Sequence, residues 1–203
     1  KPSAQALANM DKRWRVRYLM LAPHRLGFFL AMVVLVASGL WWALVQLDRS
    51  TGWLALPSVI SPTLVHSAVM AFGFIPLFFS GFLFTAGPKW LGVEAPLAKD
   101  LRVPLFSLAA GWLLWLVGAH LHAGVAWAGL ALACFGLVWM TVQFWGRIRR
   151  SQAPDQLHAR VIGTACVVGC VSLAGLLLSL VFEAHATARA WIFTGLWGFV
   201  VVV

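Results

Sequence analysis

A single histidine, His66, lies within a long apolar segment and is the most chemically informative residue of the sequence. It is the only ionisable side chain between Pro57 and Pro88. An imidazole inside a bilayer is unfavourable unless it has a partner, so such a residue is a candidate for function. Neutral imidazole is a common ligand of metals and of haem iron. We therefore expect His66 to bind a metal or haem, or else to form a hydrogen bond with a neighbouring helix.

Four residues are predicted to share a helix face with His66. At about 100° per residue, Met70, Gly73, Ser80 and Gly81 fall within roughly 60° of it. Pro76 removes a backbone hydrogen bond and is expected to bend the helix between them. Small residues beside a kink leave room for a flat group such as haem, but they also suit close packing of two helices. Both interpretations remain open from the residues alone.

The composition is that of an integral membrane protein. The chain is 62% hydrophobic and only 10% charged, with a mean hydropathy of +0.88. Soluble domains are about half apolar and about a quarter charged. The net charge of +9 does not indicate nucleic acid, because the basic residues lie between apolar runs and form no patch with exposed aromatic residues. The expected surroundings are a lipid bilayer.

The pattern of apolar runs predicts an all-α, polytopic transmembrane helix bundle. A span needs about 20 apolar residues, and an open sheet edge cannot be satisfied in lipid. Five complete spans are expected, followed by the start of a sixth, and the chain is interpreted as part of a longer protein. They cover residues 26–47, 62–84, 103–121, 123–144, 161–182 and 190–203. Residues 1–25 form a basic N-terminal segment, of which Met10–Leu21 is either an interfacial helix or a disordered tail.

The basic residues predict the orientation in the membrane. Thirteen of the 15 Lys and Arg residues fall on one side of the predicted bundle, and only Arg49 and Arg189 fall on the other. Positively charged loops stay in the cytoplasm, so the N-terminus is expected to be cytoplasmic. His66 then lies near the outer end of the second span, next to the periplasm in a bacterium.

The remaining histidines differ in their predicted depth in the membrane. His24 precedes the first span on the cytoplasmic side, about 30 Å from the outer face, so it cannot share an iron with His66. It either serves a second site or contacts lipid phosphates beside Arg25. Three histidines share the outer side with His66, and each is either an axial or copper ligand or a solvated loop residue: His120, His122 and His185. Cys166 and Cys170, four apart on one span, offer soft copper ligands or simple packing.

Two stretches carry a resemblance to a known family. One is Ala22-Pro23-His24-Arg25 at the start of the first span. The other is His66 with Met70-Ala71-Phe72-Gly73-Phe74 and Gly81-Phe82-Leu83-Phe84-Thr85-Ala86-Gly87-Pro88-Lys89-Trp90. These two stretches resemble the NnrS family of bacterial membrane proteins. Many members read His-Ala-His-Glu-Met before Phe-Gly, where this chain has His66-Ser67-Ala68-Val69-Met70. The segment is more distantly similar to the second helix of subunit I in haem–copper oxidases.

The resemblance implies a fold and a function. It implies a protein of roughly twelve spans, of which this chain is the first half, in the bacterial inner membrane. It also implies haem, with type b favoured, and copper, in a protein of the nitric oxide response. His66 is the implied haem ligand, and Met70, Gly73, Gly81 and His24 are further candidates for the cofactor site. The implied small-molecule partner is nitric oxide or another diatomic gas.

Two other functions remain open. A quinol-linked oxidoreductase of haem–copper type would need a further cluster of histidines, which these residues do not supply. A non-redox transporter would need charged residues along a path through the spans, and the predicted spans contain none. The sequence favours the haem protein of the nitric oxide response and leaves open whether it is an enzyme.

Overall fold

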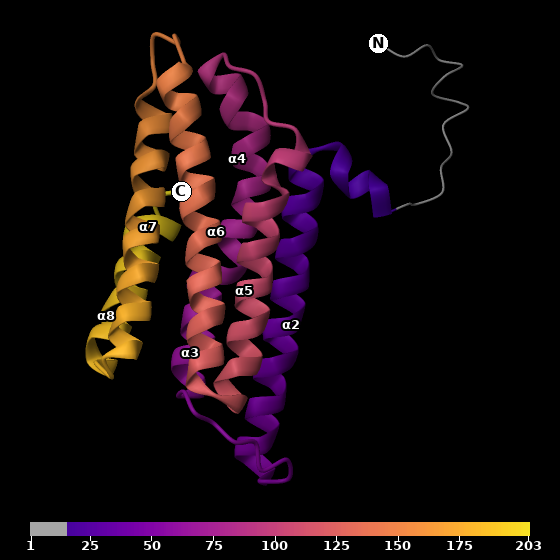
Figure 1. Cartoon of the computed structure of the whole chain (residues 1–203), viewed down its shortest axis with the longest axis vertical. Coiled ribbons are helices and arrows are strands. Elements are labelled where there is room, and N and C mark those ends of the chain that lie inside the picture. Colours follow the sequence, from indigo (N-terminus) through magenta and orange to yellow (C-terminus); the bar gives the residue numbers. More distant parts are fainter. Residues whose placement is uncertain (1–15) are drawn as a thin grey trace.

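Apolar segments of this length can satisfy their backbone in a bilayer only as helices, and the chain forms such helices throughout. The computed structural model describes residues 16–203. Its long helices run alternately up and down and pack side by side (Figure 1). Five helical segments are long and apolar enough to cross a membrane, and the described residues contain no strand. The predicted all-α bundle with five complete spans is confirmed.

The structure gives the bounds of each element. The long α-helices are α2 (Pro23–Thr51), α5 (Arg102–Leu121), α6 (Ala123–Arg150) and α7 (Leu157–Val181). The second span consists of α3 (Pro62–Val69), the π-helical segment η2 (Met70–Phe74) and α4 (Ile75–Leu91). The chain ends in α8 (His185–Gly195) and a second π segment, η4 (Leu196–Val200). Short 3-10 helices, η1 (Val16–Leu21) and η3 (Ala98–Leu101), precede α2 and α5.

Several helices extend beyond the predicted spans into the polar boundary. The first begins at Pro23 and ends at Thr51, and the fourth continues through Arg147 to Arg150. Basic side chains in the last turn of a helix interact favourably with its dipole, so these residues prolong α6. Of the expected interfacial segment, residues 10–15 lie outside the described part. Val16–Leu21 form η1, which Figure 1 shows projecting sideways from the bundle.

The predicted break in the second span is a π-helical turn. Pro76 cannot donate a backbone hydrogen bond to Phe72, and η2 ends directly before it at Phe74. A π turn holds more residues than an α turn and often marks a functional position. Residues after η2 are therefore rotated about the helix axis relative to His66, compared with an ideal α-helix.

The α5–α6 hairpin is packed through glycines. A Cβ atom added to Gly111 or Gly129 would lie 2.5 or 2.6 Å from a backbone nitrogen of the facing helix. Gly118 and Gly136 have equally close backbone neighbours across the same pair. Small residues allow this approach, and in lipid close packing replaces the hydrophobic effect as the main attraction between helices.

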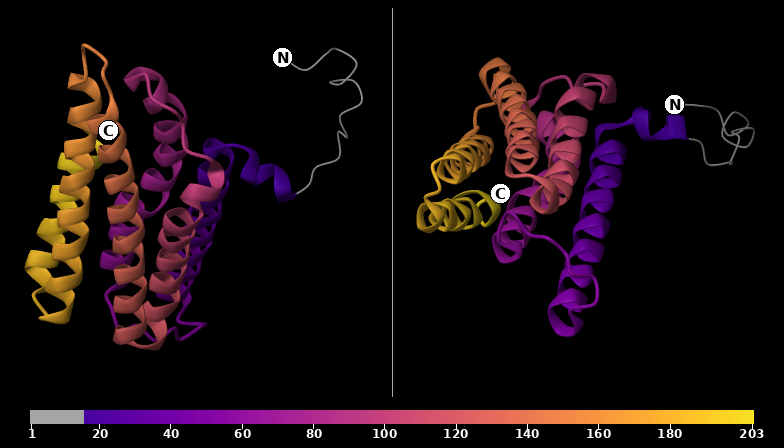
Figure 2. Two further views of the ribbon diagram at one scale, coloured as in Figure 1. Left: turned by 45° about the horizontal axis from the view of Figure 1, so that its top comes forward. Right: turned by 60° about the horizontal axis from the view of Figure 1, so that its bottom comes forward.

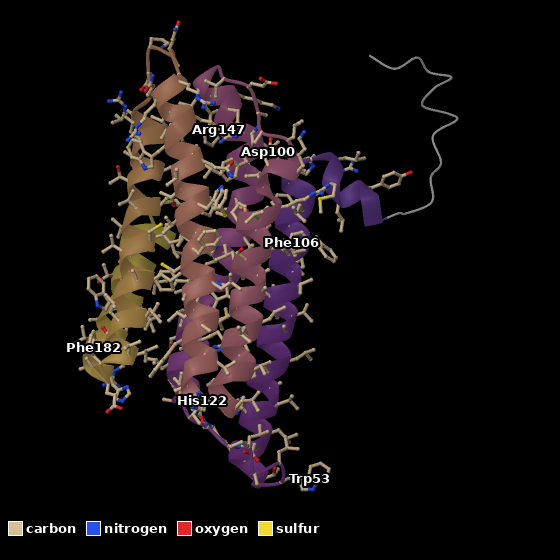
Figure 3. All side chains as sticks on the ribbon, in the orientation of Figure 1. Trp53, Asp100, Phe106, His122, Arg147 and Phe182 are labelled. Carbon is tan, nitrogen blue, oxygen red and sulfur yellow. The ribbon has the colours of Figure 1, made fainter. Side chains whose placement is uncertain are left out.

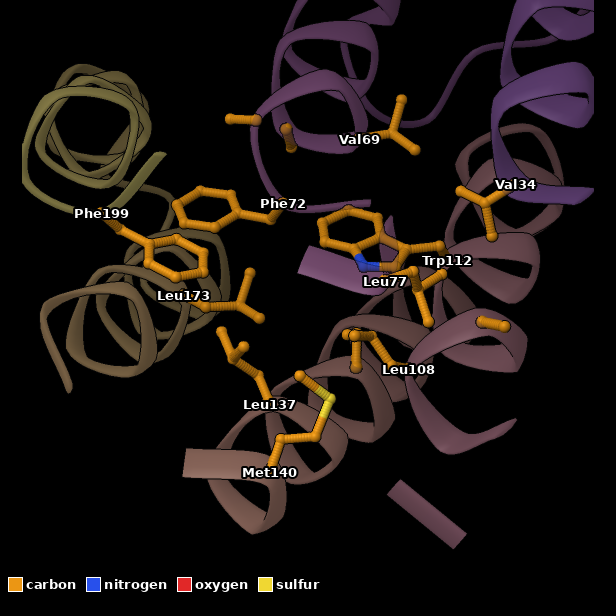
Figure 4. Close-up of a cluster of buried hydrophobic side chains, with 14 of the residues drawn as sticks. Val34, Val69, Phe72, Leu77, Leu108, Trp112, Leu137, Met140, Leu173 and Phe199 are labelled. Carbon is orange, nitrogen blue, oxygen red and sulfur yellow. The ribbon is translucent and has the colours of Figure 1, made fainter. Parts of the chain in front are cut away.

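Aromatic side chains fill the space between the remaining helices (Figure 4). Trp112 on α5 and Phe72 on η2 are both fully buried. The Phe72 ring covers Gly195 of α8, and the Phe199 ring covers Gly169 of α7. The first contact connects the second span to α8, and the second connects η4 to α7. Helices α7 and α8 lie together on the side of the bundle away from α2 (Figure 2).

The two ends of the bundle differ in charge. The end that carries Asp100 and Arg147 also holds the turn between α6 and α7, whereas Trp53, His122 and Phe182 mark the opposite end (Figure 3). Within residues 16–203, the basic loops that follow α4 and α6 therefore lie at the same end of the bundle. Cytoplasmic orientation of this end remains a prediction from the charge rule.

The glycine packing predicts a stability difference. Gly129→Ala should lower the free energy of unfolding by about 1–3 kcal/mol, because the new methyl group overlaps the backbone of α5. Gly146→Ala on the same helix is the matched control, since no atom lies within 4 Å of its added Cβ. Thermal unfolding in detergent measures both. Equal midpoints for the two variants would contradict the close approach.

Candidate cofactor site at His66

His66 lies in the second turn of α3 and has no hydrogen-bond partner. Its Nδ1 atom is enclosed and unpaired in the described part of the chain. Leaving a buried polar atom unpaired costs about 1–3 kcal/mol, so an unpaired ring nitrogen in a membrane helix calls for an explanation. His66 also lines a cavity of about 1140 Å³. Nδ1 itself is closed off by protein, whereas the rest of the imidazole, which forms no hydrogen bond in the described chain, faces the cavity.

The cavity lies between the second span on one side and α6, α7, α8 and η4 on the other. Its volume of about 1140 Å³ is slightly above the range of about 300–1,000 Å³ that is usual for ligand pockets. The apolar wall is formed by Leu64, Met70, Ala71, Ile75, Trp127, Leu180, Ile192, Phe193 and Leu196. The polar rim includes Ser61, Thr63, Ser67, Glu183, His185 and Arg189. This arrangement suits a large apolar ligand with polar groups at one edge.

The ring of His66 stacks on Trp42 of α2. The two ring centroids are 4.1 Å apart and the planes differ by 11°. The guanidinium carbon of Arg49 lies 5.3 Å from the centroid of the same Trp42 ring. Arg49 also donates hydrogen bonds to Gln46 Oε1 (3.1 Å) and to Thr63 Oγ1 (3.3 Å). The His66 side chain is therefore held by a planar contact from the first span.

Met70 lines the cavity, whereas Gly73 and Gly81 do not. Met70 lines the same wall as His66. An added Cβ on Gly73 would meet Val69 and Val34, and one on Gly81 would lie 3.0 Å from the His24 Cα. Gly73 and Gly81 therefore serve helix packing against α2. The predicted common face is lost because η2 changes the helical phase after His66.

His24 lies at the opposite end of the bundle from His66. Its Nδ1 is 3.4 Å from Thr85 Oγ1 on α4. The expectation that depth separates His24 from His66 agrees with this position. The structure gives His24 a polar neighbour but no further metal-binding side chain, since no three His, Cys, Asp or Glu residues gather anywhere in residues 16–203.

His120 is held in the structure by both ring nitrogens. Its Nε2 accepts a hydrogen bond of 2.8 Å from Trp41 Nε1, so the proton resides on Nδ1, which donates to the Pro57 carbonyl. The Val59 backbone N–H donates to the Ala119 carbonyl beside it (2.9 Å). Neither nitrogen of His120 is free for a metal. The residue instead anchors the loop between α2 and α3 to the end of α5.

His122 and His185 have different positions at the same end. His122 caps α6, with Nδ1 accepting a hydrogen bond of 3.0 Å from the Gly124 N–H. His185 was expected in a link between spans, but it begins α8 and lines the cavity rim one turn before Arg189. Of the three outer-side histidines, His185 alone shares the cavity with His66. Sequence reasoning missed Arg189 and Trp42, because only their tertiary contacts connect them to His66.

The residues around the cavity fit haem better than copper. Haem needs one or two axial ligands, and His66 offers an unpaired imidazole on the wall of a large apolar cavity. Copper centres usually combine several histidine or sulfur ligands. In the described chain such donors do not gather, and the three free cysteines lie apart from the cavity. Cys170 instead contacts Thr141 Oγ1 at 3.3 Å.

The hydrogen bonds of His120 predict a structural role. His120→Ala should reduce the free energy of unfolding by about 1–2 kcal/mol, because Trp41 Nε1 and the Pro57 carbonyl both lose a partner. Trp53→Ala is the control, since this highly exposed side chain makes no hydrogen bond within residues 16–203 and does not line the cavity. Thermal unfolding measures both variants. A midpoint for His120→Ala as high as that of Trp53→Ala would contradict the anchoring role.

Comparison with known proteins identifies the family. A family model described as NnrS protein matches residues 18–203, so it covers all five spans as well as the cavity. No curated protein and no solved structure matches the chain. The resemblance noted in the first two spans thus extends over nearly the whole sequence. The chain is a member of the NnrS family.

Proposed function

We propose that this NnrS-family chain is a haem-binding protein of the bacterial inner membrane that acts in the nitric oxide response, with His66 as an axial ligand. The observation that carries the proposal is the unpaired imidazole of His66 on the wall of a cavity of about 1140 Å³. Family membership supports the connection with nitric oxide.

The described residues would hold a haem in a specific way. His66 would give a ring nitrogen to the iron from the wall formed by α3. Apolar side chains such as Met70, Ile75 and Leu196 would cover the macrocycle. Arg189, at the rim and without an ion-pair partner in the described chain, would face the carboxylates at the edge of the macrocycle. His185, also at the rim, would be a second imidazole within the same cavity.

A bound haem would supply an iron that changes oxidation state and binds diatomic gases. The protein would contribute apolar walls that exclude water, and a histidine on the iron. Nitric oxide is small and apolar enough to enter from lipid or from the outer rim. The basic end of the bundle lies opposite the rim, so the charge rule puts the N-terminus in the cytoplasm and the rim next to the periplasm.

The alternative of a quinol-linked oxidoreductase of haem–copper type has less support. Such an enzyme needs a binuclear centre with several histidine ligands beside the haem. Near His66 the described residues offer His185 alone, because both nitrogens of His120 are engaged. The site geometry therefore favours a single haem over a haem–copper pair among residues 16–203.

Visible spectroscopy tests the proposal. The purified full-length protein should show a Soret band that shifts on reduction, and His66→Ala should abolish or shift that band. His122→Ala is the matched control: it removes an outer-side imidazole that caps α6 and does not line the cavity. Its spectrum should equal that of the wild type. An absent Soret band, or an unchanged band in His66→Ala, would refute the role of His66.

Nitric oxide gives a second test on the same preparation. Addition of the gas to the reduced protein should shift the Soret band, because the open cavity beside His66 leaves room for a diatomic ligand. The wild type and His122→Ala should respond alike. A reduced spectrum that does not change with nitric oxide would mean that both axial positions are closed, which contradicts a gas-binding role.

A further inference from the structure

The contacts of Trp42 suggest how the orientation of His66 is maintained. Its indole ring lies parallel to the imidazole, with the centroids 4.1 Å apart. Stacked rings hold one another's planes through dispersion and electrostatic attraction, worth about 0.5–1.5 kcal/mol beyond area burial. No hydrogen bond fixes the imidazole in the described chain. Trp42 is thus the side chain that restrains the ring of His66.

Arg49 contacts Trp42, the residue on which His66 stacks. Its guanidinium lies over the Trp42 ring, and its two hydrogen bonds join Gln46 on α2 to Thr63 on α3. A cation over an indole face is attracted by about 0.5–2 kcal/mol. Arg49, Trp42 and His66 form one connected group across the first two spans, which we call the Arg–Trp–His stack.

The charge of Arg49 is not neutralised by a direct ion pair. Its sequence neighbour Asp48 turns both carboxylate oxygens to the backbone N–H groups of Leu54 and Leu56, each at 3.0 Å. Elsewhere in the described chain Arg49 has no carboxylate partner. The positive guanidinium of Arg49 therefore lies over the Trp42 ring that stacks on His66, while the Asp48 carboxylate is bound to backbone N–H groups of the following loop.

We propose that Trp42 and Arg49 are positioning residues for the His66 site. Trp42 sets the plane of the imidazole, and Arg49 holds Trp42 and carries a positive charge that would favour the reduced form of a bound haem. The inference rests on the proposed haem function. It adds two residues of the first span, α2, to the site. Proteins adjust the reduction potential of a haem through the orientation of its ligands and through nearby charges.

Redox titration tests the role of Arg49. Arg49→Gln should shift the equilibrium between ferric and ferrous haem several-fold toward the ferric form, because it removes a unit positive charge from the stack. Arg49→Lys, which keeps the charge, should stay within about twofold of the wild type. Arg25→Gln, which removes a charge at the opposite end, is the control. A wild-type potential in Arg49→Gln would overturn the electrostatic role.

Electron paramagnetic resonance of the ferric haem tests Trp42, because the g-values depend on the orientation of the axial imidazole. Trp42→Leu should retain haem but shift or broaden the signal, and Trp42→Phe should restore it. Trp53→Leu, which alters a highly exposed indole on the following loop, should leave the signal unchanged. A wild-type signal in Trp42→Leu would overturn the positioning role.

A measurement on haem-free protein separates this inference from the haem proposal. Diethyl pyrocarbonate modifies unprotonated imidazoles, and peptide mass spectrometry reports the rate at His66. Trp42→Leu should raise that rate several-fold, because the indole covers one face of the ring. An unchanged rate would refute the stacking contact itself. A raised rate in a protein whose His66→Ala variant keeps its Soret band would uphold the contact and refute the haem ligand.

Discussion

Polar groups inside a bilayer must find their partners within the protein, and the described part of this chain follows that constraint closely. Trp115 Nε1, buried in the bundle, donates to the Val65 carbonyl (3.3 Å). Thr141 returns its hydroxyl to the carbonyl one turn earlier (2.8 Å). His120 engages both ring nitrogens. The unpaired Nδ1 of His66 is an exception to this pattern.

The comparison with other unpaired atoms strengthens the case for His66. Trp112 Nε1 and Ser172 Oγ are also buried without partners, but neither residue lines the cavity beside His66. Arg147 leaves Nε unpaired yet donates from Nη1 to the Gln143 carbonyl and lies over the Phe84 ring. His66 alone among the four residues combines an unpaired nitrogen with a position on the wall of a large cavity. This combination distinguishes a ligand site from imperfect packing.

Small residues determine where the helices pack closely, and the π turn determines where the cavity opens. Glycines let α5 approach α6, and Gly81 lets α4 approach α2, so these contacts leave no space for a ligand. The π segment η2 interrupts this packing beside His66, where Met70 and Ala71 line the cavity. The second span therefore packs tightly near its basic end and opens near the other end. Gly73 and Gly81, expected beside a ligand, lie on the packed side instead.

Sequence reasoning recovered what depends on composition and local order. Apolar runs gave the five spans, and the single histidine in the second run marked the site. The shared helix face was predicted incorrectly, because arithmetic at a constant angle per residue cannot anticipate a π turn. His66 and His120 were both candidate ligands, since both lie near the outer ends of spans. Their difference depends on Trp41 and Pro57, which are 79 and 63 residues from His120 and meet it only in the folded bundle.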